Sequence, residues 1–233
     1  QALTQERARS LLEAGLNALV VPVDGLGLNH DELRRRPGLF ETAVKAMRMV
    51  KAMSPALHLS VVTTVTSRNM EQLTSLAHWV YGQPEVINAI CYHTLSGNLG
   101  GPLQDDPLWY AKSDLWPGGH PALEAQLQEL IRLRQQGLPF VNSVEELRSM
   151  AQFYRTPSVP LRPCDQYGRG MLALPGGGVK LCPEHDPVGN ITEQSLLEIW
   201  RSDRAMALCR EMARCHRNCH FQTNFAYARH EVD

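Results

Sequence analysis

The chain has 233 residues, a length that fits one or two domains, and its 43% hydrophobic and 20% charged residues exclude wholesale disorder. The 23 basic and 24 acidic side chains give a net charge of −1, so charge favours neither nucleic acid nor an anionic membrane as a partner. No apolar run approaches the roughly 18 residues of a membrane span, and no charged leader precedes a hydrophobic core, which predicts a cytoplasmic protein.

The first part of the chain alternates between short apolar runs and amphipathic segments. The apolar runs predict strands at residues 18–23, 59–65 and 86–92, the first of them buried on both faces, and a short fourth strand at residues 139–142. Apolar residues at helical spacing predict helices capped by Thr4 and Asn69, a helix carrying Phe40 to Val50, a helix at residues 121–136, and a helix opened by the capping box Ser143-x-x-Glu146.

Alternating strands and helices imply right-handed crossovers and a parallel sheet. Four strands are too few to close an eight-stranded barrel, so residues 1–155 are predicted to form a partial (β/α) barrel. The chain begins at Gln1 in what reads as the middle of a domain, from which we expect an N-terminal truncation. Functional groups are expected where the strands end: Asp24, residues 64–69 and residues 92–96. Residues 97–120 predict either a functional lid or a locally disordered loop.

Residues 156–233 have a different character and predict a second, small domain. Apolar residues 171–174 and 179–181 flank Pro175-Gly-Gly-Gly178, which is typical of a β-hairpin because glycine supplies the positive φ of tight turns. Ser195-x-x-Glu198 is a further capping box, and the helix that it opens is expected to break near Ser202.

The cysteines are concentrated in this second domain. Five of the six lie there, at positions 164, 182, 209, 215 and 219, and Cys91 is expected to pack in the core from within a strand. Because a cytosolic protein keeps its thiols reduced, such a cluster favours a metal or iron–sulfur site over disulfides. The hairpin brings Cys164 and Cys182 to one end of a ribbon. Two alternatives are that the cysteines are small buried hydrophobes, or that His216 and His220 join them in a zinc site.

The order of these motifs resembles the SPASM/twitch region that follows the barrel in radical S-adenosylmethionine (radical SAM) enzymes. The resemblance is carried by Cys164-x12-Gly177-x4-Cys182, residues 188–191, residues 195–200 and Cys215-x3-Cys219 in the second domain, and by residues 21–25, His30-Asp31, Arg34-Arg35 and residues 37–40 in the first. The three-cysteine loop C-x3-C-x2-C of that family is absent from the sequence, and Met206 stands where a full SPASM domain has its first tail cysteine.

The resemblance implies an auxiliary [4Fe–4S] cluster on Cys164, Cys182, Cys215 and Cys219, with Cys209 as the alternate ligand or a core thiol. It also implies that the longer parent enzyme binds S-adenosylmethionine (AdoMet) and a second [4Fe–4S] cluster, and that a 5′-deoxyadenosyl radical acts on a peptide or small-molecule substrate. An electron donor such as a flavodoxin or ferredoxin follows from that chemistry. This chain alone is expected to be inactive.

The same resemblance suggests AdoMet contacts at Asp24, Thr64 and Asn69. The residues themselves leave other roles open, because Asp24 is nearly as well explained as a loop cap and Asn69 as a helix cap. His30-Asp31 fits an acid/base pair or, better, a polar loop contact, and residues 34–36 fit a solvated loop. Two other functions remain open: a structural Cys/His zinc module, and a degenerate, non-catalytic relative that binds substrates.

Overall fold

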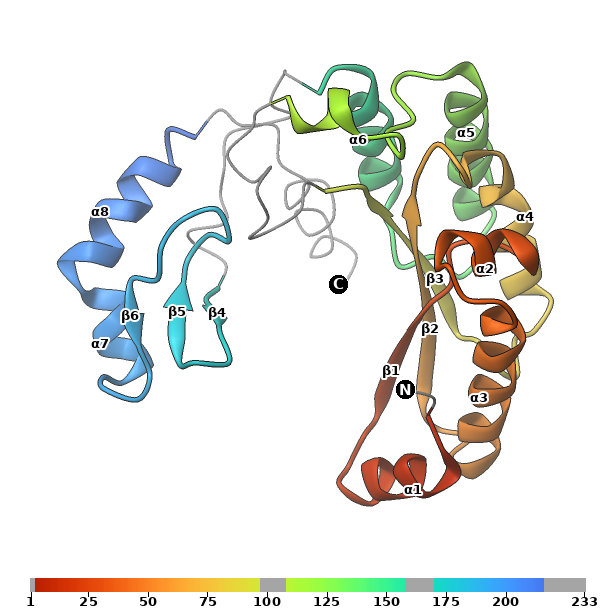
Figure 1. The fold of residues 1–233 in the computed structure, drawn as a ribbon, viewed down its shortest axis with the longest axis horizontal. Coiled ribbons are helices and arrows are strands. Elements are labelled where there is room, and N and C mark those ends of the chain that lie inside the picture. The colour runs from red at the N-terminus through yellow and green to blue at the C-terminus, as the bar shows by residue number, and fades with distance from the viewer. Residues whose placement is uncertain (1–2, 97–107, 158–169, 216–233) are drawn as a thin grey trace. The chain divides into compact units, whose positions relative to one another are not determined.

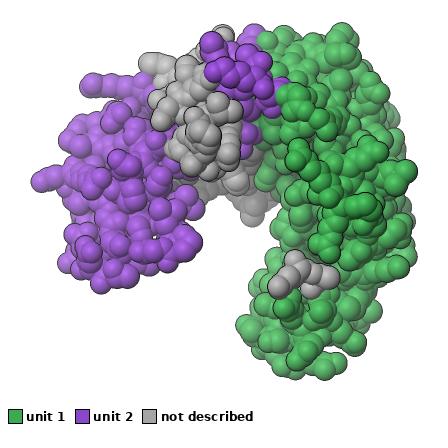
Figure 2. Space-filling model, viewed as in Figure 1, with its two compact units in different colours: residues 1–95, 114–155, 223–233 green, residues 96–113, 156–222 purple. Residues whose placement is uncertain are grey.

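The computed structural model describes residues 3–96, 108–157 and 170–215. The chain divides into two compact units, coloured separately in Figure 2. Unit 1 comprises residues 1–95, 114–155 and 223–233, and unit 2 comprises residues 96–113 and 156–222.

Unit 1 is built from alternating helices and strands. In chain order its elements are α1 (Gln5–Glu13), β1 (Ala18–Pro22), α2 (Leu28–Leu33), α3 (Leu39–Met53), β2 (His58–Val65), the 3-10 turn η1 (Met70–Gln72), α4 (Leu73–Tyr81), β3 (Ala89–Thr94), α5 (Pro121–Gln135) and α6 (Val144–Arg155). The strands form a parallel sheet in the order β1-β2-β3, with Ala18 opposite His58 and Ser60 opposite Ala89. The predicted α/β class with parallel strands is therefore confirmed.

The sheet of unit 1 has two different faces. Figure 1 shows α3, α4 and α5 on one side of it, as right-handed crossovers require. Residues that point to that side, such as Val61, Val65 and Tyr92, are completely buried. Residues of the opposite parity, such as Val62, Thr64 and His93, are only partly buried. We call this second side the open face of the sheet.

Two predicted strands differ from the observed ones. β1 was expected to be buried on both faces, which is wrong: β1 is an edge strand of the described sheet, and Val20 is 57% exposed. The third strand begins at Ala89 rather than at residue 86, because the amides of Val86 and Ile87 donate to the Gln83 carbonyl and prolong the turn after α4.

The predicted fourth strand is reduced to a single parallel bridge between Ile90 and Phe140. Beyond it, the Asn142 side chain takes the place of a strand backbone: its Oδ1 accepts from the Tyr92 amide at 2.6 Å and its Nδ2 donates to the Tyr92 carbonyl at 3.0 Å. No further pairing follows because Ser143 and Glu146 form the predicted capping box, which starts α6 at once.

Unit 2 contains η2 (Trp109–Lys112), β4 (Leu172–Ala173), β5 (Gly178–Lys180), β6 (Gly189–Asn190), α7 (Leu196–Arg201) and α8 (Asp203–Met212). The hairpin is confirmed as β4–β5, with Gly177 in its turn at φ +82°, and β6 adds a third antiparallel strand that the sequence did not reveal. The predicted break also holds, because Ser202 ends α7 and caps α8. Of the predicted lid, residues 97–107 lie outside the described residues.

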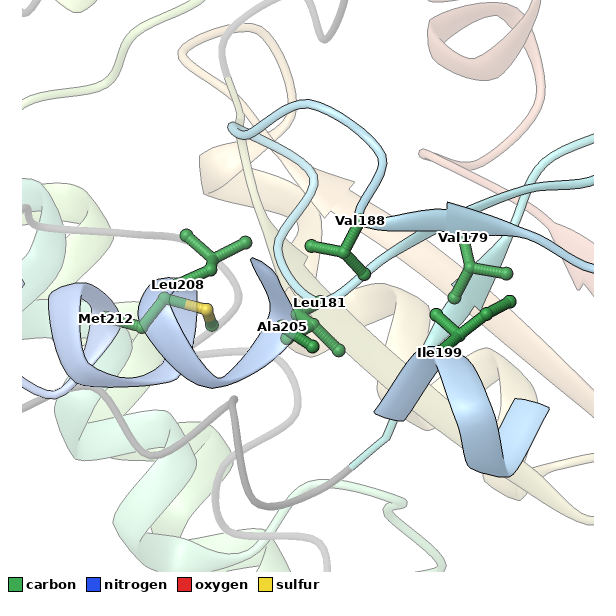
Figure 3. Close-up of a cluster of buried hydrophobic side chains, with 7 residues drawn as sticks. All are labelled: Val179, Leu181, Val188, Ile199, Ala205, Leu208 and Met212. Atoms are coloured by element: carbon green, nitrogen blue, oxygen red, sulfur yellow. The ribbon is translucent and has the colours of Figure 1, made fainter. Parts of the chain in front are cut away.

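A small hydrophobic core joins the hairpin of unit 2 to its helices. Figure 3 shows its members, Val179, Leu181, Val188, Ile199, Ala205, Leu208 and Met212. All are at least 91% buried. β6 approaches α7 so closely that a Cβ at Gly189 would lie 2.8 Å from Ile199 Cγ1, so only glycine fits there.

Candidate functional site

Asp24 lies just after β1 and forms hydrogen bonds with residues of two neighbouring segments, β2 and α2. Its Oδ1 accepts from the Thr64 amide at 3.0 Å, and its Oδ2 accepts from Arg34 Nε at 2.5 Å in an ion pair. Its own amide donates to His30 Nδ1 at 3.0 Å. Only 10% of the Asp24 side chain is exposed. Both carboxylate oxygens are thus already engaged, and Asp24 connects β1 to β2 and to α2.

Asn69 makes the second connection between these strand ends. Its Nδ2 donates to the carbonyls of Asp24 and Thr64, at 2.7 and 2.8 Å, and its Oδ1 accepts from the amide and hydroxyl of Thr66, at 2.7 and 3.0 Å. The residue is 1% exposed. Asn69 precedes η1, but its side chain makes no capping hydrogen bond, so the helix-cap interpretation is wrong. The amide is used instead to join β1 and β2, because only Nδ2 can satisfy two carbonyls at once.

His30 and Asp31 support this arrangement from α2 and are not an acid/base pair with each other. The Asp31 carboxylate accepts from the amides of Gly38 and Phe40, at 2.6 and 2.8 Å, and so satisfies the first amides of α3. His30 is 1% exposed, stacks edge-on against Phe40 and accepts the Asp24 amide. His30 and Asp31 thus make polar contacts with the neighbouring backbone, which is the role that the sequence favoured for them.

The buried His30 makes the stability of unit 1 depend on pH. Burial lowers the pKa of His30, while Asp24 acts in the opposite sense. The folded state therefore binds fewer protons than the unfolded chain around the unperturbed pKa of about 6.5. The contribution of neutral, buried His30 to the stability of unit 1 is complete above that value. It is lost as the pH falls through the lowered pKa of the folded state.

We expect the free energy of unfolding of unit 1 to decrease below about pH 6.5, by up to about 1.4 kcal/mol per pH unit for this proton. Hydrogen exchange of the β2 amides across this pH range measures it. His30→Asn keeps an acceptor but does not titrate, so its pH dependence should be weaker than that of the wild type. Equal slopes for the two proteins would contradict the assignment.

The three predicted contact residues of the first domain thus come together at one edge of the sheet, but with different accessibility. Asp24 and Asn69 are buried, whereas Thr64 is half-buried on the open face. The Thr64 hydroxyl makes no hydrogen bond within the described parts of the chain. Asp24 and Asn69 hold the strand-end backbone in place, and Thr64 is the one of the three whose side chain lies on the open face.

Arg34 is the functional candidate that sequence reasoning missed. It was assigned to a solvated loop, which is wrong for this residue, since its guanidinium pairs with Asp24 across the end of α2. The available signal was the spacing of ten residues from an acidic strand end, which suffices for a short helix to return a cation to it. Nothing in the sequence distinguishes Arg34 from Arg35 and Arg36 in this respect.

The cysteines of unit 2 are described only in part. Cys182 follows β5, Cys209 lies on α8, and both pack half-buried against the hydrophobic core of unit 2. Cys215 follows α8, and its amide donates to the Met212 carbonyl. The predicted ligands Cys164 and Cys219, and the alternative zinc ligands His216 and His220, lie outside the described residues.

The chemistry of the donor set fits an iron–sulfur cluster. Cys182 and Cys215 form no disulfide, and thiolates are the ligands that such clusters use. Within residues 3–96, 108–157 and 170–215, no three His, Cys, Asp or Glu side chains gather into a metal site. In the same ranges no helix combines the length and apolar character that crossing a membrane demands.

Comparison with known proteins gives one match for the cysteine-containing second domain and several for the fold of the chain. Residues 164–220 match the family model of SPASM, an iron–sulfur cluster-binding domain. No curated protein sequence matches the chain. Among solved structures, the chain is similar to anSMEcpe with bound AdoMet (12% identity, TM-score 0.57) and to anSMEcpe with bound AdoMet and the Cp18Cys peptide (13% identity, TM-score 0.54).

These structural matches cover 95% of this chain but only 60% and 61% of the anSMEcpe chains, so the chain spans about three fifths of their length. At this level of identity the likeness shows the fold. The resemblance read from the late cysteines is confirmed for residues 164–220.

Proposed function

We propose that this chain is part of a radical SAM enzyme that acts on a peptide, and that its second domain binds an auxiliary [4Fe–4S] cluster. The observation that carries the proposal is the match of residues 164–220 to an iron–sulfur cluster-binding domain. The similarity of fold to anSMEcpe with bound AdoMet and peptide supports the AdoMet and peptide parts. We also propose that residues 1–155 form the partial (β/α) barrel domain and residues 156–233 the cluster-binding domain.

The proposed ligands of the cluster are Cys164, Cys182, Cys215 and Cys219. When bound, the cluster supplies electron transfer or a Lewis-acidic iron, and its potential depends on burial and on hydrogen bonds to sulfur. The chain contributes an apolar wall for this purpose, because Cys182 packs against the core of Val179, Leu181 and Ile199. Thiolate ligands need reducing surroundings, which is why we place the protein in the cytoplasm with an electron donor of the flavodoxin or ferredoxin class.

In the first domain, the residues of this chain position the strand ends against which AdoMet is proposed to bind. Asp24 and Asn69 join β1 to β2 through buried hydrogen bonds, and Arg34 balances the buried carboxylate. Thr64 is the member of the group that offers a hydroxyl on the open face. The sequence holds no C-x3-C-x2-C loop, so we propose that this chain alone does not cleave AdoMet.

Anaerobic reconstitution with iron and sulfide tests the proposal. We expect a brown chromophore with about four iron and four sulfide per chain. Tight, colourless zinc binding without the chromophore would select a structural zinc module instead. With AdoMet and a reductant, the reconstituted chain is expected to release no 5′-deoxyadenosine, and turnover by this chain alone would contradict the need for a further cysteine loop.

A further inference from the structure

The residues around Cys182 form a tight turn between β5 and β6. The Cys182 carbonyl accepts from the His185 amide at 3.2 Å, which closes a β-turn with Pro183 at its second position, where proline is favoured. The segment is held on both sides by the hydrophobic core of unit 2, because Leu181 and Val188 are 2% and 5% exposed (Figure 3). The backbone of Cys182 is therefore fixed by its own turn and by the core.

Lys180, the last residue of β5, is bound to this turn through its side chain. Its Nζ donates to the Pro183 carbonyl at 3.0 Å, and the residue is half-buried. Because side chains alternate along a strand, Lys180 points away from the core that Val179 enters. Consecutive Cα atoms are about 3.8 Å apart, so the bonded ammonium lies within about 9 Å of the Cys182 Cα.

No carboxylate neutralises the positive charge of Lys180 in the parts of the chain that the structure describes. There, Lys180 forms no ion pair with an Asp or Glu side chain, and its hydrogen-bond acceptor is the Pro183 carbonyl. A carbonyl dipole orients an ammonium but does not cancel its charge. Net charge around the cysteine ligands is one of the factors that set the reduction potential of an iron–sulfur cluster. The turn at Cys182 thus carries a fixed cation of the kind that changes such a potential.

We propose that Lys180 raises the reduction potential of the auxiliary cluster bound through Cys182. This inference rests on the proposed function and adds the residue that adjusts the electron affinity of that cluster. Reduction transfers one electron from a donor to the oxidised cluster and makes the cluster more negative by one charge, and no bond of the protein forms or breaks. A fixed positive charge stabilises the reduced form more than the oxidised form, so Lys180 favours reduction.

The experiment is an anaerobic redox titration of the reconstituted full chain with dithionite, in which the visible spectrum reports the fraction of reduced cluster at each potential. Lys180→Met keeps the apolar stem of the side chain and removes the charge. We expect this variant to make reduction about fivefold less favourable, which lowers the midpoint potential by about 40 mV for a one-electron couple. Its iron and sulfide content should stay close to that of the wild type, because Lys180 is not a ligand.

Two further variants separate charge from shape. Lys180→Arg keeps a positive charge and a donor and should retain the wild-type potential. Arg204→Met removes a positive charge from an exposed position of α8, and as the matched control it should also leave the potential unchanged. A wild-type potential in Lys180→Met, or an equal decrease in Lys180→Met and Lys180→Arg, would overturn the role of the Lys180 charge alone. Loss of the cluster from both Lys180 variants would show that the residue only builds the turn. A wild-type chain that forms no cluster would overturn the proposed function as well.

Discussion

Replacing Cys182 by alanine is expected to abolish the iron–sulfur chromophore of the reconstituted chain. An iron–sulfur cluster is held by cysteine thiolates, and alanine offers no ligand in place of one of them. Cys182 lies just beyond Leu181, which follows β5, and packs half-buried against the core of unit 2. The measurement is iron and sulfide content per chain together with the visible spectrum. The same result is expected for Cys164→Ala.

Three other cysteine variants make this result interpretable. Cys182→Ser keeps the volume of the side chain while remaining a poor iron ligand, and it shows whether loss of the cluster reflects chemistry or unfolding. Cys209→Ala removes a thiol that packs against the same core and is expected to retain most of the chromophore. Cys91→Ala, on β3 of unit 1, is the matched thiol deletion outside the second domain. A full signal in Cys182→Ala would refute the ligand set.

Replacing Asn69 by alanine is expected to destabilise unit 1 by about 3 kcal/mol, a large fraction of the stability of an ordinary domain. The side chain makes four hydrogen bonds at a position that is 1% exposed. Its removal leaves the carbonyls of Asp24 and Thr64 without the Nδ2 donor, and unpaired buried groups cost more than the bonds themselves contribute. Hydrogen exchange of the β2 amides reports on unit 1 separately from unit 2.

Asn69→Asp sharpens the same test. The aspartate keeps an acceptor for Thr66 but places a negative charge against two carbonyls and near the Asp24 carboxylate, so it is expected to destabilise unit 1 at least as much as alanine. Asn17→Ala, at an exposed position before β1, is the control and should change the free energy of unfolding by less than about 0.5 kcal/mol. Stability close to that of the wild type in both Asn69 variants would show that the strand ends are held by other contacts.

Local patterns were read correctly where neighbouring residues decide the structure. Thr4 caps α1 through the Arg7 amide, and Ser195 and Glu198 form their capping box because the partners lie three residues apart. The hairpin follows from glycine at a turn that needs a positive φ. The late cysteines were recognised for a similar reason, since their spacing along the chain carries the family pattern that residues 164–220 match.

The sequence by itself therefore determined the alternation of strands and helices, the caps and turns, and the concentration of thiols in the second domain. Only the tertiary structure decided that Arg34 pairs with Asp24, that Asn69 joins two strands, and that β1 is exposed at an edge. The Asn69–Asp24 contact joins residues 45 positions apart, and such a partner is set by how the strands align. An asparagine that caps a helix and one that bridges two strands look alike in sequence, because the same amide serves whichever backbone groups the fold brings to it.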